Sequence, residues 1–248
     1  MLIAVRTYPT PAWKGVEVSC TAGITDESQW IRLFPVPYRF LSPDKRFRKY
    51  QWIEVNAKKA SDPRPESYEL DIDSIQIRSE PIPTTSNWQA RKDIVFPLKA
   101  HCLCCLKAQR DEKDAPTLGI FKPKTINSFH IEKAEPEWSP EQAARLRQSS
   151  FFDTQPVREL EKIPYTFKYK FACDEPSCHS HELMCTDWEV GQSYHNWVRR
   201  YGSDWERYFK QRYETEMILI NDTHFYVGTM HEHPDSWIIV GLFYPKPL

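Results

Sequence analysis

Two cysteines and two histidines lie within the stretch CDEPSCHSH, residues 173–181 of a chain that has only seven Cys and eight His. Zinc in proteins is usually held by four Cys or His ligands, which come from two short clusters that the fold brings together. Cys173, Cys178 and His181 supply three such ligands, and the turn-forming residues between the two cysteines favour a tight loop. This spacing predicts a metal knuckle that still needs one ligand.

The missing ligand is expected from the other cysteine cluster of the chain, HCLCCL at residues 101–106. If this stretch is helical, its three cysteines point in different directions, so only one or two of them can face a shared ion. We favour Cys104 as the fourth ligand, with Cys102 next. Of the other cysteines, Cys20 and Cys105 are expected in the core, where free cysteines usually lie.

Two local alternatives to this ligand set stay open. His179 could replace His181, and Cys185 could replace the distant cysteine. Zinc is the expected metal, and an iron–sulfur cluster is the alternative, since such clusters are usually held by four Cys thiolates. The lack of a run of the form C-x2-C-x2-C argues against the cluster.

A second constellation, His231-Glu232-His233, falls in a predicted loop between two strands. Two histidines and a carboxylate could bind a catalytic metal, and either histidine could act as a general base. An ordinary polar turn, with Pro234-Asp235 making the bend, explains the same residues and is the interpretation we favour. The chain has no nucleophile elbow, P-loop or dinucleotide fingerprint, so the sequence leaves open whether the protein is an enzyme.

Basic side chains gather at three places along the chain, several of them beside aromatic residues: Arg46, Arg48 and Lys49; Lys168 and Lys170; Arg199 and Arg200. Lys and Arg bind phosphates, and unpaired bases stack on exposed aromatic rings. The formal net charge is −1, so a nucleic-acid surface would have to be a local patch. The competing interpretation is that these residues form the solvated faces of their elements.

The elements that position these residues divide the chain into two regions and a connection. Residues 1–80 hold short runs rich in Val, Ile, Trp and Tyr between turn residues, which predicts closely spaced strands in a small OB-like or SH3-like β-barrel. The proline-containing segment 81–97 is expected to be a linker. Residues 98–248 predict a mixed α/β region that carries the metal knuckle and packs against the first region, so the expected fold class is α+β.

Periodicity and capping patterns place the knuckle within the second region. Residues 163–173 alternate between apolar and polar side chains, which predicts a half-buried strand that ends at Cys173. The patterns Thr186-x-x-Glu189 and Ser203-x-x-Glu206 each predict the start of a helix. Further helices are expected at 98–110 and 139–148. The stretch 236–244 is apolar on both faces, which predicts a central strand.

No apolar run approaches the roughly 20 residues that a membrane-spanning helix needs, and the first residues do not resemble a signal peptide. We therefore expect a cytoplasmic protein without a membrane partner, whose cysteines are thiols or metal ligands. The leading hypothesis is a zinc-stabilised nucleic-acid-binding or nucleic-acid-processing accessory protein. The alternatives are a metal-dependent hydrolase that uses residues 231–233, and a structural subunit that binds another protein.

Overall fold

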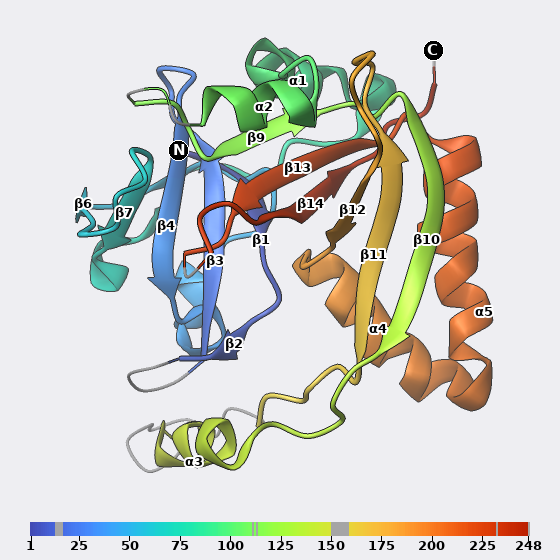
Figure 1. The fold of residues 1–248 in the computed structure, drawn as a ribbon. Coiled ribbons are helices and arrows are strands. Elements are labelled where there is room, and N and C mark those ends of the chain that lie inside the picture. Colours follow the sequence, from blue (N-terminus) through green and yellow to red (C-terminus); the bar gives the residue numbers. More distant parts are fainter. Residues whose placement is uncertain (13–16, 111, 113, 150–158, 232, 248) are drawn as a thin grey trace.

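Short strands build the first part of the protein. The computed structural model describes residues 1–12, 17–110, 112, 114–149, 159–231 and 233–247 (Figure 1). One sheet has the order β1-β3-β4-β7-β6, with β2 paired to β3, and a separate small sheet pairs β5 with β8. The bounds of these strands are β1 Leu2–Arg6, β2 Thr10–Pro11, β3 Glu17–Ile24, β4 Trp30–Val36, β5 Ile53–Glu54, β6 Ala57–Lys59, β7 Ser67–Leu70 and β8 Gln76–Ile77.

The larger sheet stays open among the described residues, with β1 and β6 at its two edges. It therefore does not close into the barrel that the strand spacing predicts. The parallel pairing of β4 with β7 covers only two residue pairs, and β5 and β8 pair with each other instead of extending the sheet. The edge strand β1 packs against the C-terminal part of the chain, where Val5 lies directly beside Gly241. The second region thus covers this edge.

Residues 81–97, predicted as a linker, contain α1 (Thr85–Val95), which is followed by a 3-10 turn at Phe96–Leu98. The first turn of α1 is interrupted by three consecutive residues with left-handed backbone, the last of which is Trp88. The Trp88 ring contacts Phe243 and Tyr244, with centroid distances of 5.0 and 5.1 Å. The segment is therefore packed against the end of the chain as well as connecting the two regions.

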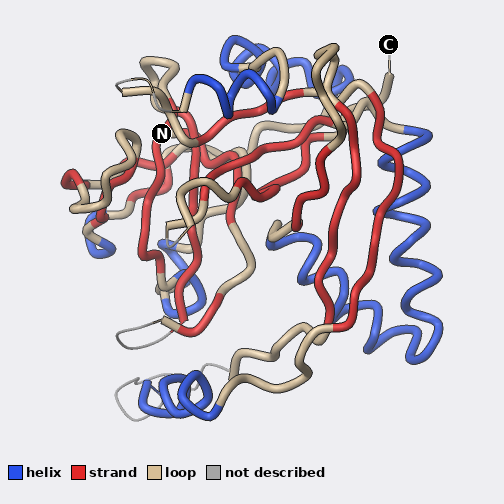
Figure 2. Tube along the Cα trace, in the orientation of Figure 1, coloured by secondary structure: helices blue, strands red, loops and turns tan. Residues whose placement is uncertain are grey.

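Two three-stranded antiparallel sheets and four helices follow, and they confirm the α+β class (Figures 1 and 2). The sheet orders are β10-β11-β12 and β14-β13-β9. The helices are α2 Leu103–Gln109, α3 Pro140–Ser149, α4 Trp188–Tyr201 and α5 Trp205–Lys210, and α5 continues into the π-helical segment η6 Gln211–Ile220. The strands are β9 Leu118–Phe121, β10 Thr125–Lys133, β11 Tyr165–Ala172, β12 His181–Met184, β13 His224–Thr229 and β14 Trp237–Phe243.

The expectation of a central strand at 236–244 is wrong. Among the described residues, β14 pairs along its length with β13, the middle strand of that sheet, and forms a single bridge on its other side, between Ile239 and Cys185. β14 is nevertheless almost fully buried because β1 and β12 pack against it. A strand that is apolar on both faces can thus owe its burial to neighbours that share little or none of its hydrogen-bonded ladder.

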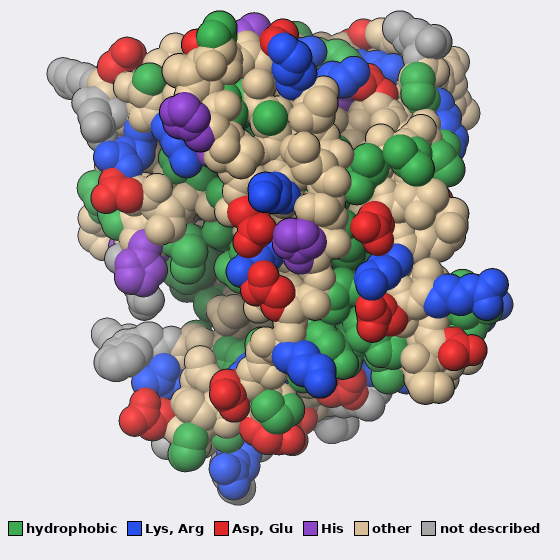
Figure 3. Space-filling model, turned by 45° about the vertical axis from the view of Figure 1, so that its right-hand side comes forward, with side chains coloured by type: hydrophobic (Ala, Val, Ile, Leu, Met, Phe, Trp, Pro, Cys, Tyr) green, Lys and Arg blue, Asp and Glu red, His purple; other side chains and the backbone are tan. Residues whose placement is uncertain are grey.

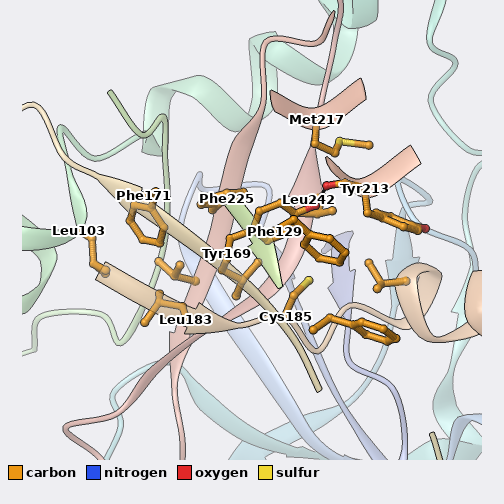
Figure 4. Close-up of a cluster of buried hydrophobic side chains, with 14 of the residues drawn as sticks. Leu103, Phe129, Tyr169, Phe171, Leu183, Cys185, Tyr213, Met217, Phe225 and Leu242 are labelled. Carbon is orange, nitrogen blue, oxygen red and sulfur yellow. Dashed lines mark hydrogen bonds between the residues drawn. The ribbon is translucent and has the colours of Figure 1, made fainter. Parts of the chain in front are cut away.

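The largest buried cluster lies between the sheet β10-β11-β12, the sheet β14-β13-β9 and the C-terminal helices (Figure 4). The alternation of β11 turns Phe167, Tyr169 and Phe171 into this cluster, as the sequence predicts. Tyr213 and Met217 of η6 close it from the other side. Burying an aromatic side chain of this size contributes roughly 1.5–3 kcal/mol, so this cluster fixes β11 and the loop that follows it.

The two regions are joined by a buried ion pair at the start of α4. The N-cap of α4 is Asp187 rather than the predicted Thr186, because the Asp187 Oδ1 atom accepts a hydrogen bond from Glu189 N at 2.8 Å. Its Oδ2 atom accepts from Leu242 N at 2.9 Å and from Lys49 Nζ at 3.1 Å. Asp187 is 2% exposed, so the Lys49 ammonium neutralises a carboxylate that water hardly reaches.

We expect Lys49→Met to lower the free energy of unfolding by about 3–5 kcal/mol, because it leaves the buried Asp187 charge without its cation. The matched control is Lys45→Met, which removes a neighbouring lysine whose partner, Asp73, is 89% exposed. Such a surface pair is worth at most about 1 kcal/mol. Urea unfolding followed by tryptophan fluorescence measures both variants, and equal losses would contradict the structural role of Lys49.

His224 at the start of β13 makes folding stability depend on pH. The side chain is 1% exposed and packs between the rings of Phe96 and Phe243. Burial lowers the pKa of His224 to about 4, although the neighbouring Asp222 acts in the opposite direction. The unfolded chain binds a proton at this side chain near pH 6.5 and the folded chain does not. The contribution of His224 to the free energy of unfolding is therefore fully present above pH 6.5. It is lost as the pH falls from 6.5 towards 4.

We expect the native protein to lose about 2–3 kcal/mol more stability than His224→Gln between pH 7 and pH 4.5. The glutamine keeps a polar side chain at this position but cannot take up a proton. Urea unfolding of both proteins at the two pH values gives the difference, in which the contributions of all other titrating groups cancel. Parallel losses in the two proteins would show that His224 does not titrate in this range.

Candidate metal centre

Three thiols and one imidazole meet above the loop between β11 and β12. One ligand atom from each of Cys104, Cys173, Cys178 and His181 lies within 4.8 Å of the others. The His181 Nε2 atom is 3.2 Å from Cys104 Sγ and 3.5 Å from Cys178 Sγ. Zn–S bonds of about 2.3 Å and Zn–N bonds of about 2.0 Å in a tetrahedron place S and N ligand atoms about 3.5 Å apart. The four groups therefore have the size of a tetrahedral metal site.

The β11–β12 hairpin positions three of the four groups. Cys173 directly follows β11, and His181 begins β12 opposite Phe171. The ring centroids of His181 and Phe171 are 5.4 Å apart. The loop between them turns at a hydrogen bond from Cys178 N to Glu175 O, 2.9 Å long. A second hydrogen bond, from Cys173 N to Cys178 Sγ at 3.3 Å, brings the two cysteines together. The local sequence alone therefore produces most of this arrangement.

The fourth group comes from α2, whose start meets the β11–β12 loop. Leu103, fully buried, anchors the start of this helix in the core shared with β11 and β12. His101 adds a contact between its Nε2 atom and the Asp174 carbonyl oxygen, at 3.2 Å. Cys104, the next residue after Leu103, then faces His181. The helical geometry selects this cysteine from the cluster at 101–106.

The electrostatics of the four groups suit a cation. Burial, followed by the neighbouring Cys173 and Cys178, raises the pKa of Cys104 to about 12, because thiolates so close together repel one another. Burial also lowers the pKa of His181, which keeps its imidazole neutral and able to bind a metal. A divalent cation would reverse the effect on the thiols, since metal coordination deprotonates them.

The remaining candidates for this centre lie elsewhere. His179 is exposed on the loop, and Cys185 is buried in the core beyond the end of β12. Cys102 and Cys105 face each other instead, with Glu175 nearby. Cys20 lies on β3, where its Sγ atom accepts a hydrogen bond from Arg32. Cys20 and Cys105, both expected in the core, are half-buried instead.

The histidine-rich loop before β14 shows no comparable cluster. His231 Nδ1 lies 3.3 Å from the Asp62 carboxylate, and His233 is exposed. Glu232 lies outside the described residues. Among the residues that the structure describes, neither histidine belongs to a group of three or more close metal ligands. The hydrolase hypothesis therefore stays a prediction that the described residues do not test.

The seven basic residues that suggested nucleic acid are spread over a loop, β11 and the end of α4. Most of them contact acidic groups of the chain itself: Lys49 with Asp187, Arg48 with Glu80, Lys168 with Glu132 and Arg199 with Glu161. Arg46 donates to the carbonyl oxygens of Leu41 and Arg39. Lys170 and Arg200 are exposed. Figure 3 shows positive and negative side chains intermingled on one face, so these residues do not form a uniform basic surface there.

A polar pocket between the two regions was not foreseen from the sequence. Tyr8 and Arg39 from the first region and His195 and Arg199 from α4 line it, and its volume is about 200 Å³. The Tyr8 hydroxyl lies 2.8 Å from His195 Nε2, and His195 Nδ1 lies 3.2 Å from the Glu161 carboxylate. No local motif connects these residues, because 187 positions separate Tyr8 from His195.

Comparison with known families covers nearly the whole chain. Residues 1–97 match a family described as Domain of unknown function (DUF8758), and residues 99–248 match one described as Domain of unknown function (DUF8757). No curated protein matches the chain. All four groups of the candidate metal centre lie within the second match, which spans more than half of the sequence. The chain therefore belongs to the family of proteins that contain the Domain of unknown function (DUF8757).

Proposed function

We propose that the protein binds one zinc ion through Cys104, Cys173, Cys178 and His181. The supporting observation is the separation of the ligand atoms, 3.2 and 3.5 Å, which agrees with the edge of a zinc tetrahedron. Three cysteines and one histidine are also a common donor set for structural zinc. Four protein ligands leave no open position for water or substrate, so the ion would have a structural rather than a catalytic role.

The same distances favour a single ion over an iron–sulfur cluster. A cluster places several iron and sulfide atoms between its ligands and is usually held by four thiolates. The atoms of Cys104, Cys178 and His181 leave space for only one ion between them. The fourth position is an imidazole, whose neutral form is favoured by burial. Zinc fits both the size and the composition of this group.

The ion would connect parts of the chain that are far apart in sequence. Cys104 and His181 are separated by 77 positions. α2 has seven residues, and a helix of that length is not stable without tertiary contacts. Zinc binding would hold α2 on the β11–β12 hairpin, and the binding free energy would contribute directly to folding.

We expect the purified protein to contain about one zinc per chain and Cys178→Ser to contain none. Cys178 is half-buried, so its replacement costs little in packing, and the loss of stability reports the lost ion. The expected fall in Tm is more than about 10 °C, since each kcal/mol is worth roughly 2–4 °C in a chain of this size. Elemental analysis and thermal unfolding provide the two measurements.

Cys20→Ser is the matched control, because Cys20 is also half-buried but lies on β3, away from the four groups. It should keep its zinc, and its Tm should stay within a few degrees of the native value. A chelator should reproduce the effect of Cys178→Ser in the native protein. A Cys178→Ser protein that keeps both its zinc and its Tm would refute the proposal.

Nucleic-acid binding is a second candidate, supported by the corner between α4 and α5. Tyr201 and Tyr208 stack there with centroids 3.7 Å apart, and Tyr208 is 37% exposed. Two exposed guanidinium groups lie beside these rings. The Arg200 group is 5.2 Å from the centroid of the Tyr201 ring, and the Arg207 group is 5.6 Å from the centroid of the Tyr208 ring. Exposed aromatic rings flanked by arginines suit the bases and phosphates of a single strand.

We expect a labelled single-stranded oligonucleotide to bind with an affinity that falls steeply as the salt concentration is raised from about 50 to 200 mM. The double variant Arg200→Glu/Arg207→Glu should weaken binding at least about tenfold, because it reverses two phosphate-binding charges. Lys58→Glu, an exposed change on β6, should bind like the native protein. Fluorescence anisotropy measures all three, and no binding of the native protein at low salt would exclude this candidate.

A further inference from the structure

A second pair of cysteines lies beside the candidate metal centre. The Sγ atoms of Cys102 and Cys105 are 2.7 Å apart, and Cys102 Sγ also accepts a hydrogen bond from Cys105 N at 3.1 Å. Cys102 is the N-cap of α2, and Cys105 is the third residue of the helix. Within the folded protein, the first turn of α2 therefore holds the two sulfur atoms together.

The separation of these sulfur atoms does not suit a shared metal ion. Together with Glu175 they form a group of three metal-type ligands within 4.8 Å. Two thiolates on one tetrahedral zinc ion, with bonds of about 2.3 Å, lie about 3.8 Å apart. The observed 2.7 Å is about 1 Å shorter than this and is closer to the roughly 2.05 Å of a sulfur–sulfur bond. The geometry favours a bond between the two sulfur atoms.

We propose that Cys102 and Cys105 are a reversible dithiol–disulfide pair that reacts with low-molecular-weight disulfides such as oxidised glutathione. Cys102 is fully buried and Cys105 is half-buried, so Cys105 meets the reagent first. Its sulfur attacks one sulfur of the reagent, which forms a mixed disulfide and releases one thiol. The Cys102 sulfur then attacks the Cys105 sulfur and releases the second thiol. Two electrons and two protons pass from the protein to the reagent.

The oxidised pair is compatible with the neighbouring centre. Cys104 lies between the two cysteines in sequence but faces His181, 3.2 Å away. Closing the bond shortens the sulfur separation by only about 0.7 Å within one helical turn, so Cys104 can keep its position. This inference rests on the geometry of α2, and it holds whether or not the four-ligand centre binds zinc.

The test is to count the reactive cysteines in one peptide. The full-length protein is reduced, freed of reductant and incubated with graded oxidised glutathione, then denatured with a chelator, alkylated with iodoacetamide and digested with trypsin. The tryptic peptide 100–107, AHCLCCLK, contains three cysteines. It should carry three labels from the reduced protein and a single label, on Cys104, from the oxidised protein. Before alkylation, the oxidised intact chain should be about 2 Da lighter than the reduced chain, and dithiothreitol should restore both the mass and the three labels.

Cys105→Ser should prevent the loss of mass, and it is the preferred variant because Cys105 is half-buried and its replacement perturbs the core least. Cys20→Ser should oxidise like the native protein. Three labels after oxidation, or a bond that links Cys104 to Cys173 or Cys178, would overturn the proposal. The proposal would also fail if the reduced native protein contained two metal ions per chain and Cys105→Ser contained only one. The pair would then be part of a second metal site.

Metal content separates this inference from the proposed zinc site. If the native protein contains no zinc but the peptide loses two labels, the dithiol pair is established and the zinc proposal fails. If zinc is present and the peptide keeps three labels, the zinc proposal stands and the dithiol pair is excluded.

Discussion

The carboxylate of Asp187 receives hydrogen bonds from three separate parts of the chain. Glu189 N comes from the first turn of α4, Leu242 N from β14, and Lys49 Nζ from the first region. An unpaired charge at a site this buried would cost several kcal/mol, so the three donors have to reach the carboxylate together. The backbone supports the same junction, because Tyr8 N donates to Thr186 O at 2.7 Å. The two matched ranges of the chain are therefore parts of one continuous structure.

This junction also determines where the candidate metal centre lies. β12 begins at His181, one of the four grouped residues, and ends three residues before Asp187. Between them, Cys185 forms a bridge with Ile239 of β14, and Thr186 N donates to Ile239 O at 2.8 Å. One short strand thus has the metal-type cluster at its start and the buried carboxylate just beyond its end. A shift of β12 would disturb both.

The parts of the fold that the sequence predicts are those that depend on neighbouring residues. Strand alternation at 163–173 places Cys173 at a strand end, and a short loop brings Cys178 and His181 back to it. Helical geometry predicts only that one or two of the three cysteines at 102–105 can face a shared ion, and Cys104 was the one we favoured. The structure brings these four side chains together, and their binding of a metal stays a prediction. The pair Cys102 and Cys105 has the spacing C-x2-C, a signal that was present in the sequence but was obscured by the cysteine between them.

The features that the sequence does not reveal depend on distant contacts. Lys49 looked like a nucleic-acid-binding residue, because nothing near it in sequence indicates Asp187, 138 positions away. β14 looked like a central strand because its burial comes from β1 and β12 as well as from its paired neighbour. The strands of the first region suggested a barrel. The edge strand β1 is instead covered by β14, which only the complete chain can supply.

The wide separation of β1 and β14 along the chain has a consequence for the order of folding during synthesis. The β-pairing of β13 with β9 joins residues about a hundred positions apart, and β14 completes both the β1 edge and the Asp187 junction. Contacts between such distant residues form late and slow the folding of a chain. The first region leaves the ribosome long before residues 237–243, so its β1 edge and Lys49 lack these contacts until β14 has emerged. Unpaired edges of this kind are prone to aggregate, so the packing of β14 on β1 also protects the first region from edge-to-edge association.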